Sequence, residues 1–214
     1  MKRLALFLTG LLMLAAGCSD TESHSKAVYM LLDTSGTYTQ ELDKAAAIIN
    51  YLLGTLQPND SLAVARIDTG SFSEKDIVQK MTFDGRPSVS NQQKRDFKSN
   101  VDTFVKSVKG APYTDITGGI LQAAESLYET RSGRKVILIF SDMEEELDKG
   151  YVRDIPLQLQ GIEVVALNVT KLRGDIIDPR KYMGRLEDWK TKVEAGNGQW
   201  RVVNDLERLE RILE

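Results

Sequence analysis

The sequence predicts a three-layer α/β fold, in which helices cover both faces of a mostly parallel central sheet. Along most of the chain, apolar runs of strand length alternate with segments whose apolar residues recur at helical spacing. The runs at 27–32 and 135–140 are apolar throughout, which is typical of strands buried on both faces of a parallel sheet. Sheets of this kind bind ligands beyond the carboxyl ends of their strands. We therefore expect functional side chains directly after these two runs.

The first half of the chain is expected to contain three strands and two long helices. The predicted strands are 27–32, 62–67 and 77–83. The last of these is expected at a sheet edge because its polarity is mixed. The predicted helices are 42–53 and 97–108, each followed by a glycine, and the polar stretches 68–74 and 85–93 are predicted to be loops.

The second half continues the alternation. The predicted helices are 116–128, 147–159, 182–194 and 206–213, the second of them broken or kinked at Pro156. The predicted strands are 135–140, 162–168 and 200–203, and 171–180 is expected to be a loop. This pattern indicates one domain over residues 27–214, preceded by a separate N-terminal segment.

The first residues have the features of an export signal. Lys2 and Arg3 are followed by an apolar stretch at 4–14 that is too short for a permanent membrane span, and then by small residues. Leu14-Ala15-Ala16-Gly17-Cys18 resembles the lipobox of bacterial lipoproteins, and Cys18 is the only cysteine. The alternative is an ordinary secretory signal with an incidental cysteine.

The lipobox resemblance implies cleavage after residue 17 and acylation of Cys18, with palmitate among the acyl chains. Residues 18–26 would then be a short polar tether, and His24 within it is read as solvated rather than as a metal ligand. Ser19 in place of an aspartate implies the outer membrane of a Gram-negative cell, facing the periplasm. Two or three acyl chains suffice for stable anchoring.

The composition argues against nucleic acid as a partner. The chain has 28 Lys and Arg against 31 Asp and Glu, a formal net charge of −3. A large positive field that would attract phosphates is therefore absent.

A cluster of oxygen-bearing side chains follows the first strand. Asp33, Ser35 and Thr37 alternate directly after the apolar run, and Gly36 permits the chain to curl there. Carboxylate and hydroxyl oxygens are ligands for a hard divalent cation such as Mg²⁺. Two further residues are predicted to converge on this point: Thr114, just ahead of a helix, and Asp142, just after the strand at 135–140.

This set resembles the metal-ion-dependent adhesion site (MIDAS) of von Willebrand factor type A (VWA) domains. The family's first motif is Asp-x-Ser-x-Ser, and the sequence departs from it only at Thr37, which keeps the hydroxyl. Thr114-Asp115-Ile116 matches the threonine that opens the next helix, and the apolar strand ending at Asp142 matches the third piece. The resemblance covers residues 27–214 and implies a Rossmann-like fold.

The resemblance also implies how the ion is held. Ser35, Thr37 and either Thr114 or Asp142 would contact it directly, and Asp33 and the remaining member would act directly or through water. Mg²⁺ is the expected cation, with Mn²⁺ or Ca²⁺ as alternatives. One coordination position would remain for an Asp or Glu of a partner protein.

Several neighbouring residues allow two interpretations. Asp115 is more simply a helix cap than an ion ligand, and the acidic run 144–146 is more simply a solvated helix start than a second cation site. Tyr38 could contact a partner or pack inward. Trp189 and Trp200 are read as core or rim aromatics, and the glycine pair at 118–119 as a site of close helix packing rather than a nucleotide loop.

Three functions fit the sequence. The first is a non-catalytic, membrane-anchored module that binds a partner's acidic residue through the metal. The second is a haloacid-dehalogenase-like, Mg²⁺-dependent phosphatase, which would use Asp33 as nucleophile. That mechanism lacks its general acid, because Ser35 occupies the position where a second aspartate is needed. The third is a structural envelope component without a metal.

Overall fold

The computed structural model describes residues 24–36, 38–207, 210 and 213. The predicted signal peptide, Cys18 and most of the tether lie outside the described residues. So do Thr37 and half of the helix expected at 206–213. Within the described part, no helix is long and apolar enough to cross a membrane.

Six strands form a single sheet, in the order β3-β2-β1-β4-β5-β6. They are β1 (Lys26–Asp33), β2 (Ser61–Ile67), β3 (Ile77–Thr82), β4 (Arg134–Phe140), β5 (Ile162–Leu167) and β6 (Gln199–Val203). Only the β2–β3 pair is antiparallel, and β3 lies at an edge. The expected mostly parallel sheet and its edge strand are therefore confirmed.

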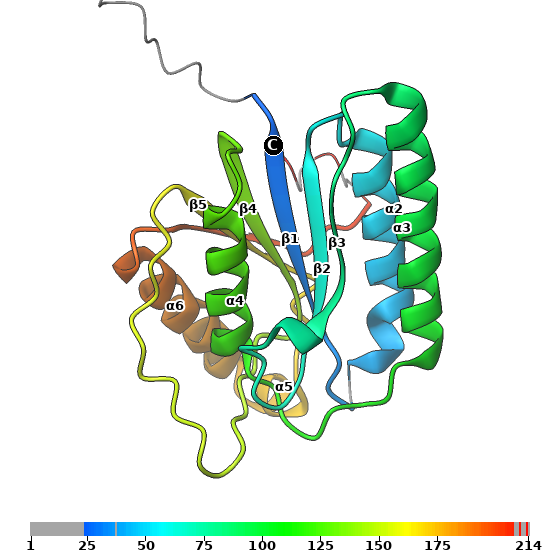
Figure 1. The fold of residues 1–214 in the computed structure, drawn as a ribbon. Coiled ribbons are helices and arrows are strands. Elements are labelled where there is room, and N and C mark those ends of the chain that lie inside the picture. Colours follow the sequence, from blue (N-terminus) through cyan, green and yellow to red (C-terminus); the bar gives the residue numbers. More distant parts are fainter. Residues whose placement is uncertain (1–23, 37, 208–209, 211–212, 214) are drawn as a thin grey trace, which may run out of the picture.

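Helices cover both faces of this sheet (Figure 1). They are α2 (Leu42–Thr55), α3 (Pro87–Ser107), α4 (Ile116–Tyr128), α5 (Arg173–Ile177) and α6 (Pro179–Ala195), with single 3₁₀ turns η2 (Thr39–Glu41) and η3 (Glu74–Asp76). The helices α2 and α3 lie on one face, and α4 and α6 lie on the other. The molecule thus has three layers, as the sequence predicts.

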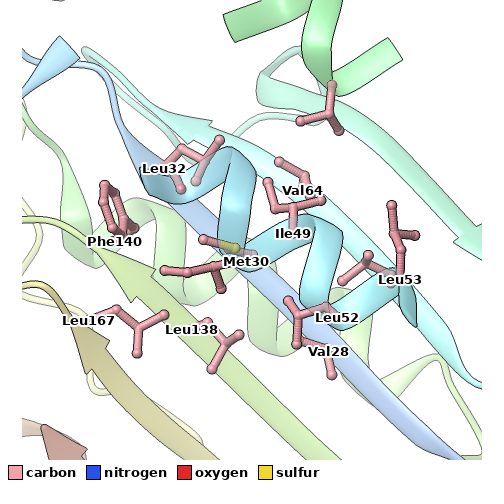
Figure 2. Close-up of a cluster of buried hydrophobic side chains, with 14 of the residues drawn as sticks. Val28, Met30, Leu32, Ile49, Leu52, Leu53, Val64, Leu138, Phe140 and Leu167 are labelled. Atoms are coloured by element: carbon pink, nitrogen blue, oxygen red, sulfur yellow. The ribbon is translucent and has the colours of Figure 1, made fainter. Parts of the chain in front are cut away.

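Two hydrophobic clusters separate these layers, and β1 contributes to both. Val28, Met30 and Leu32 enter the cluster beneath α2, which Figure 2 shows, whereas Tyr29 and Leu31 enter the cluster beneath α4. Successive side chains of a strand point to opposite faces of its sheet. A strand with helices on both sides must therefore be apolar at every position, which explains the continuous run.

The order of the strands reverses between β1 and β4. From β1 the chain continues outward to β2 and β3, and from β4 it continues in the other direction to β5 and β6. Leu32 pairs with Phe140 in the parallel register, so Asp33 and Ser141 follow at the same level of the two strands. In open α/β sheets, this switch point is where ligands bind.

The helix predicted at 147–159 is wrong. Residues 144–159 form no helix and run between β4 and β5 as an irregular segment with one turn at 149–150. Pro156 cannot donate an amide within a helix. In the extended form, Leu157 and Leu159, two residues apart, are both buried in the cluster beneath α4. Arg153 forms an ion pair with the buried Asp115, with 2.7 Å between Nη2 and Oδ2.

The two long loops predicted at 85–93 and 171–180 are also wrong in part. The helix α3 begins at Pro87, ten residues before the predicted start, and Pro87 occupies the first turn where its missing amide costs nothing. The first two turns of α3 are polar because they face solvent, which made them look like a loop. The stretch 171–180 contains the short helix α5.

The central strand β4 supplies a direct test of the packing. Leu138 is fully buried between β1 and β5. We expect Leu138→Ala to lower the free energy of unfolding by about 2–5 kcal/mol, because the deleted atoms leave a cavity that the packed layers cannot close. Urea unfolding measures the change. Val152→Ala, at a position 73% exposed, is the control and should change stability by less than about 0.5 kcal/mol.

Candidate metal centre

Asp33, the last residue of β1, is completely buried. Its Oδ1 accepts a hydrogen bond from the Ser35 amide (2.8 Å), and its Oδ2 accepts one from the Ser141 hydroxyl (2.6 Å). The first bond curls the chain back after the strand, as expected from the position of Gly36. The second joins the ends of β1 and β4. Both oxygens of Asp33 are thus oriented by the two strands of the switch point.

Asp142 follows Ser141 at the end of β4 and is 5% exposed. Its Oδ1 accepts a hydrogen bond from the Glu144 amide (2.9 Å). Between them, Met143 has a left-handed φ of 65°, and its amide donates to the Ser141 hydroxyl (3.0 Å). The turn 141–144 therefore holds the Asp142 carboxylate beside that of Asp33.

Burial of these two carboxylates has an electrostatic cost. Burial, together with the nearby charge of Asp33, raises the pKa of Asp142 to about 6, although the hydrogen bond from the Glu144 amide and the charge of Arg185 oppose the shift. Burial also raises the pKa of Asp33, although hydrogen bonds from Ser141 and Ser35 oppose the shift. Neither carboxylate forms a salt bridge with a described residue. Buried carboxylates are normally paired with a cation or coordinate a metal, so a divalent ion fits this pair.

Thr114 is held near this point by two neighbouring segments. Three residues before it, the Ala111 amide donates to the Thr34 carbonyl (2.7 Å), next to Ser35. Thr114 itself exchanges backbone hydrogen bonds with Glu146, at 2.8 and 3.0 Å. Thr114 is 5% exposed as a residue, and its hydroxyl makes no hydrogen bond to a described residue. It is therefore free to accept a new partner such as an ion or water.

Among the predicted ligands, the structure therefore assembles Asp33, Ser35 and Asp142 around the switch point and carries Thr114 on the adjoining loop. It does not describe Thr37. In the described part of the chain, no group of three or more His, Cys, Asp or Glu side chains could hold a metal. Hydroxyl ligands would have to complete the coordination of any ion bound between the two aspartates.

Tyr38 packs inward and does not face a partner. Its ring is 2% exposed and meets Phe140 edge-on, with centroids 5.2 Å apart. Its hydroxyl donates to the Asn168 carbonyl (2.6 Å) and accepts from Asn168 Nδ2 (3.0 Å). Tyr38 thus ties the loop after β1 to the end of β5, one layer below the candidate site.

Asp115 is a helix cap, as the simpler interpretation predicts. Its Oδ1 accepts from the Gly118 amide at the start of α4 (2.8 Å), and its Oδ2 accepts from the Ser71 amide (3.0 Å). Arg153 completes the set with a two-point contact to the carboxylate. The start of α4, directly after Thr114, is thus fixed by segments from three parts of the chain. The close approach expected at 118–119 is also present, since a Cβ on Gly119 would lie 3.3 Å from the Leu31 methyl groups.

The acidic run 144–146 does not begin a helix, so that prediction is wrong. Glu145 accepts hydrogen bonds from the amide (2.6 Å) and the hydroxyl (2.9 Å) of Thr117, and Lys192 lies 3.6 Å from it. The Thr117 amide has no partner within the first turn of α4, and it binds this carboxylate as helix N-termini bind anions. The run therefore docks against α4 instead of forming its own helix.

The turn after Asp142 is also held from α6, by two residues that the sequence did not reveal. Arg185 Nε donates to the Asp142 carbonyl (3.0 Å), and Trp189 Nε1 donates to the Met143 carbonyl (2.9 Å). Arg185 and Trp189 are four residues apart, so both lie on one face of the helix. Side chains that bind backbone carbonyls leave no pattern in a sequence. The sequence likewise does not reveal the role of Ser141, which stands in it only as a polar residue after a strand.

A pocket of about 800 Å³ adjoins this turn. Its walls come from the residues after Asp142, from α5 and from α6, and Arg185 lies between them. Arg185 reaches in both directions, since its Nη2 lies 2.8 Å from Oδ2 of the buried Asp175 of α5. The candidate metal centre therefore continues into a charged recess on its α5 side.

Comparison with known proteins identifies the family of the chain. The von Willebrand factor type A domain profile matches residues 27–187, so the chain belongs to the VWA family. No curated protein sequence matches the chain significantly.

The solved structures that share its fold include a pilus adhesin and a bacterial von Willebrand factor type A protein. The pilus adhesin SpaC from Lactobacillus rhamnosus GG, in its open conformation, is 12% identical with a TM-score of 0.56 over 91% of this chain. A von Willebrand factor type A protein from Catenulispora acidiphila is 13% identical with a TM-score of 0.52 over 89% of this chain. The matched regions are 29% and 41% of those chains, so the likeness concerns one domain of larger proteins.

The hydrogen bond from Trp189 gives a prediction about the turn. Trp189→Phe leaves the Met143 carbonyl buried without a donor, which costs about 1–3 kcal/mol of stability. We also expect weaker Mn²⁺ binding by titration calorimetry, because the Asp142 turn loses one of its supports. Trp200→Phe is the matched control, since that indole makes no hydrogen bond to a described residue. Equal Mn²⁺ affinity in both variants would show that the contact does not position the turn.

The raised pKa of Asp142 gives a second prediction. An acid whose pKa is higher in the folded than in the unfolded state destabilises the fold at neutral pH, and this penalty disappears as the pH falls toward its unfolded value. Without metal, we expect Asp142→Asn to stabilise the protein at pH 7 by on the order of 2 kcal/mol, and much less at pH 4. Thermal unfolding in chelator at both pH values measures this. A variant less stable than the parent at pH 7 would contradict the account.

Proposed function

We propose that the chain is a non-catalytic protein-binding module that captures an acidic residue of a partner through a divalent cation. The observation that carries this proposal is the pair of buried carboxylates, Asp33 and Asp142, which form no salt bridge with a described residue at the switch point of the sheet. Membership of the VWA family supports the same reading, because Asp33, Ser35 and Asp142 of the MIDAS-like set lie around this point.

The proposed ligands are Asp33, Ser35, Thr37, Thr114 and Asp142. Mg²⁺ is the proposed ion, with Mn²⁺ or Ca²⁺ able to replace it. Two carboxylates neutralise a divalent ion, and the hydroxyls add no charge. Such an ion keeps enough attraction for a third carboxylate, which an Asp or Glu of the partner would supply. The ion thus bridges the two proteins.

The lipoprotein features of the N-terminal segment place this module in the cell envelope. Cleavage after residue 17 and acylation of Cys18 would tether the domain through residues 18–26, at the outer membrane facing the periplasm. The likeness to a pilus adhesin is consistent with an extracytoplasmic role but shows the fold alone.

The phosphatase alternative gains no support from the structure. Ser35 occupies the position of the required general acid, and its amide is bound to Asp33. Asp33 is moreover fully buried, with both oxygens engaged by Ser35 and Ser141. The alternative of a structural role without metal predicts that cations do not change the stability of the protein. The cation titration described next distinguishes this role from the proposed one.

Titration with Mn²⁺ and Mg²⁺ tests the proposal. We expect saturating cation to raise the unfolding free energy by roughly 2.7 kcal/mol at 100 times the dissociation constant. Asp33→Asn should abolish both this shift and Mg²⁺-dependent capture of an Asp-containing peptide. Asp188→Asn is the control, because Asp188 is an exposed acid on nearby α6 and forms no ion pair with a described residue. An unchanged melting curve at saturating cation would favour the metal-free role.

A further inference from the structure

We propose that the corner formed by α5 and the start of α6 is a second contact surface for the same partner protein. This partner would carry apolar side chains beside the carboxylate that reaches the metal. The inference rests on the proposed function and extends it to the kind of segment that is recognised. The surface consists of Ile176 and Ile177 on α5 and Met183 on α6, the helix in contact with α5, and we call it the apolar corner.

The apolar corner is unusually exposed. Ile176, Ile177 and Met183 are 74%, 87% and 63% exposed, whereas most aliphatic side chains of the strands are fully buried. Exposed apolar residues that cluster, rather than occurring singly, mark interaction sites. Ile176 and Ile177 therefore expose apolar surface to water, and a bound partner could cover this surface.

The backbone beneath the corner is well anchored. Asp175, next to Ile176, is 2% exposed and accepts a hydrogen bond from the Leu172 amide (2.8 Å). The same carboxylate forms an ion pair with Arg185, with 2.8 Å between Oδ2 and Nη2. The isoleucines therefore project from a helical turn held by a buried ion pair. A presented surface of this kind binds without a large loss of conformational entropy.

One side chain connects the corner to the candidate metal centre. Arg185 donates to the Asp142 carbonyl through Nε and to Asp175 through both Nη atoms. The turn that carries a proposed metal ligand and the helix that carries Ile176 thus share a single guanidinium. A partner bound at the metal would lie next to the apolar corner.

The charges around the corner favour an acidic partner. Arg173 and Lys181 line the neighbouring pocket, and neither forms an ion pair with a described residue. Arg185 is already paired with Asp175, and Lys192 with Glu145. Glu144 and Asp188 also line the pocket. The two basic side chains without an ion pair to a described residue, Arg173 and Lys181, thus belong to α5 and the start of α6. Acidic groups of a partner would fit beside them, next to the apolar corner.

The position of the corner argues against a lipid surface as its occupant. Lys26, where β1 begins, is at the opposite end of that strand from Asp33, a separation of about 23 Å at about 3.3 Å per residue. Figure 1 shows α5 at the end of the sheet away from the start of β1. A domain tethered ahead of Lys26 therefore directs the metal centre and the corner away from its membrane. The occupant is a protein segment with apolar and acidic side chains.

Peptide binding to the full chain tests this proposal. The probes are two fluorescein-labelled peptides with one central aspartate, flanked by leucines in one and by serines in the other. In Mg²⁺, we expect the leucine-flanked peptide to bind about tenfold more tightly, because its flanks cover the corner. Ile176→Ser/Ile177→Ser should remove this preference. The matched control is Val152→Ser/Ile155→Ser, which changes two exposed aliphatic residues of the extended segment between β4 and β5.

Each outcome decides between the two proposals. If both peptides bind equally in Mg²⁺ and are released by chelator, the proposed function stands and the corner is not a contact surface. If neither peptide binds in Mg²⁺, both proposals fail. A preference that survives in the isoleucine variant, or is lost equally in the control, also overturns the assignment. Vesicles of phosphatidylethanolamine and phosphatidylglycerol complete the design. If the parent protein binds these vesicles and the isoleucine variant does not, the corner is a lipid-binding surface instead.

Discussion

The arrangement around the switch point depends on two carboxylates that the fold buries side by side. Asp33 ends β1, Asp142 follows the neighbouring parallel strand β4, and neither forms a salt bridge with a described residue. Burying a charge without a partner is costly. Their burial makes the protein less stable at neutral pH than its packing alone would allow. Under the proposed function, a cation bound between them would offset this cost, and its binding would be thermodynamically linked to folding.

The rest of the structure holds the peptide segments that carry these groups. The turn after Asp142 is fixed through its backbone carbonyls by Arg185 and Trp189 of α6. The start of α4 is fixed by Asp115, which joins Arg153 and the loop after β2. The contacts of Arg185 and Trp189 act on the backbone of the turn rather than on the Asp142 carboxylate. Side chains held by surrounding contacts in this way bind with little reorganisation.

The predictable part of this protein is the part with a strong local pattern. The continuous apolar runs gave the buried strands, and the helix at 116–128 is found with those bounds as α4. Polar segments were predicted less well, because a segment is polar both when it is a loop and when it is the solvent-facing part of a helix. The start of α3 is polar since it faces solvent as a helix, and 147–159 shows helical spacing although Pro156 and the contacts of Arg153 keep it extended. Local pattern cannot weigh a tertiary ion pair against helix formation.

The sequence by itself determined the fold class and the approximate place of the site, because burial on both faces of a parallel sheet and oxygen-rich strand ends are recorded in single short segments. It placed Asp33, Ser35 and Asp142 at strand ends and Thr114 ahead of a helix. Only the tertiary structure decided that Tyr38 packs inward, that Ser141 bridges to Asp33, and that α6 holds the Asp142 turn. These contacts join residues up to 130 positions apart, often through backbone atoms that every residue shares. Their identity therefore depends on where the whole chain brings them.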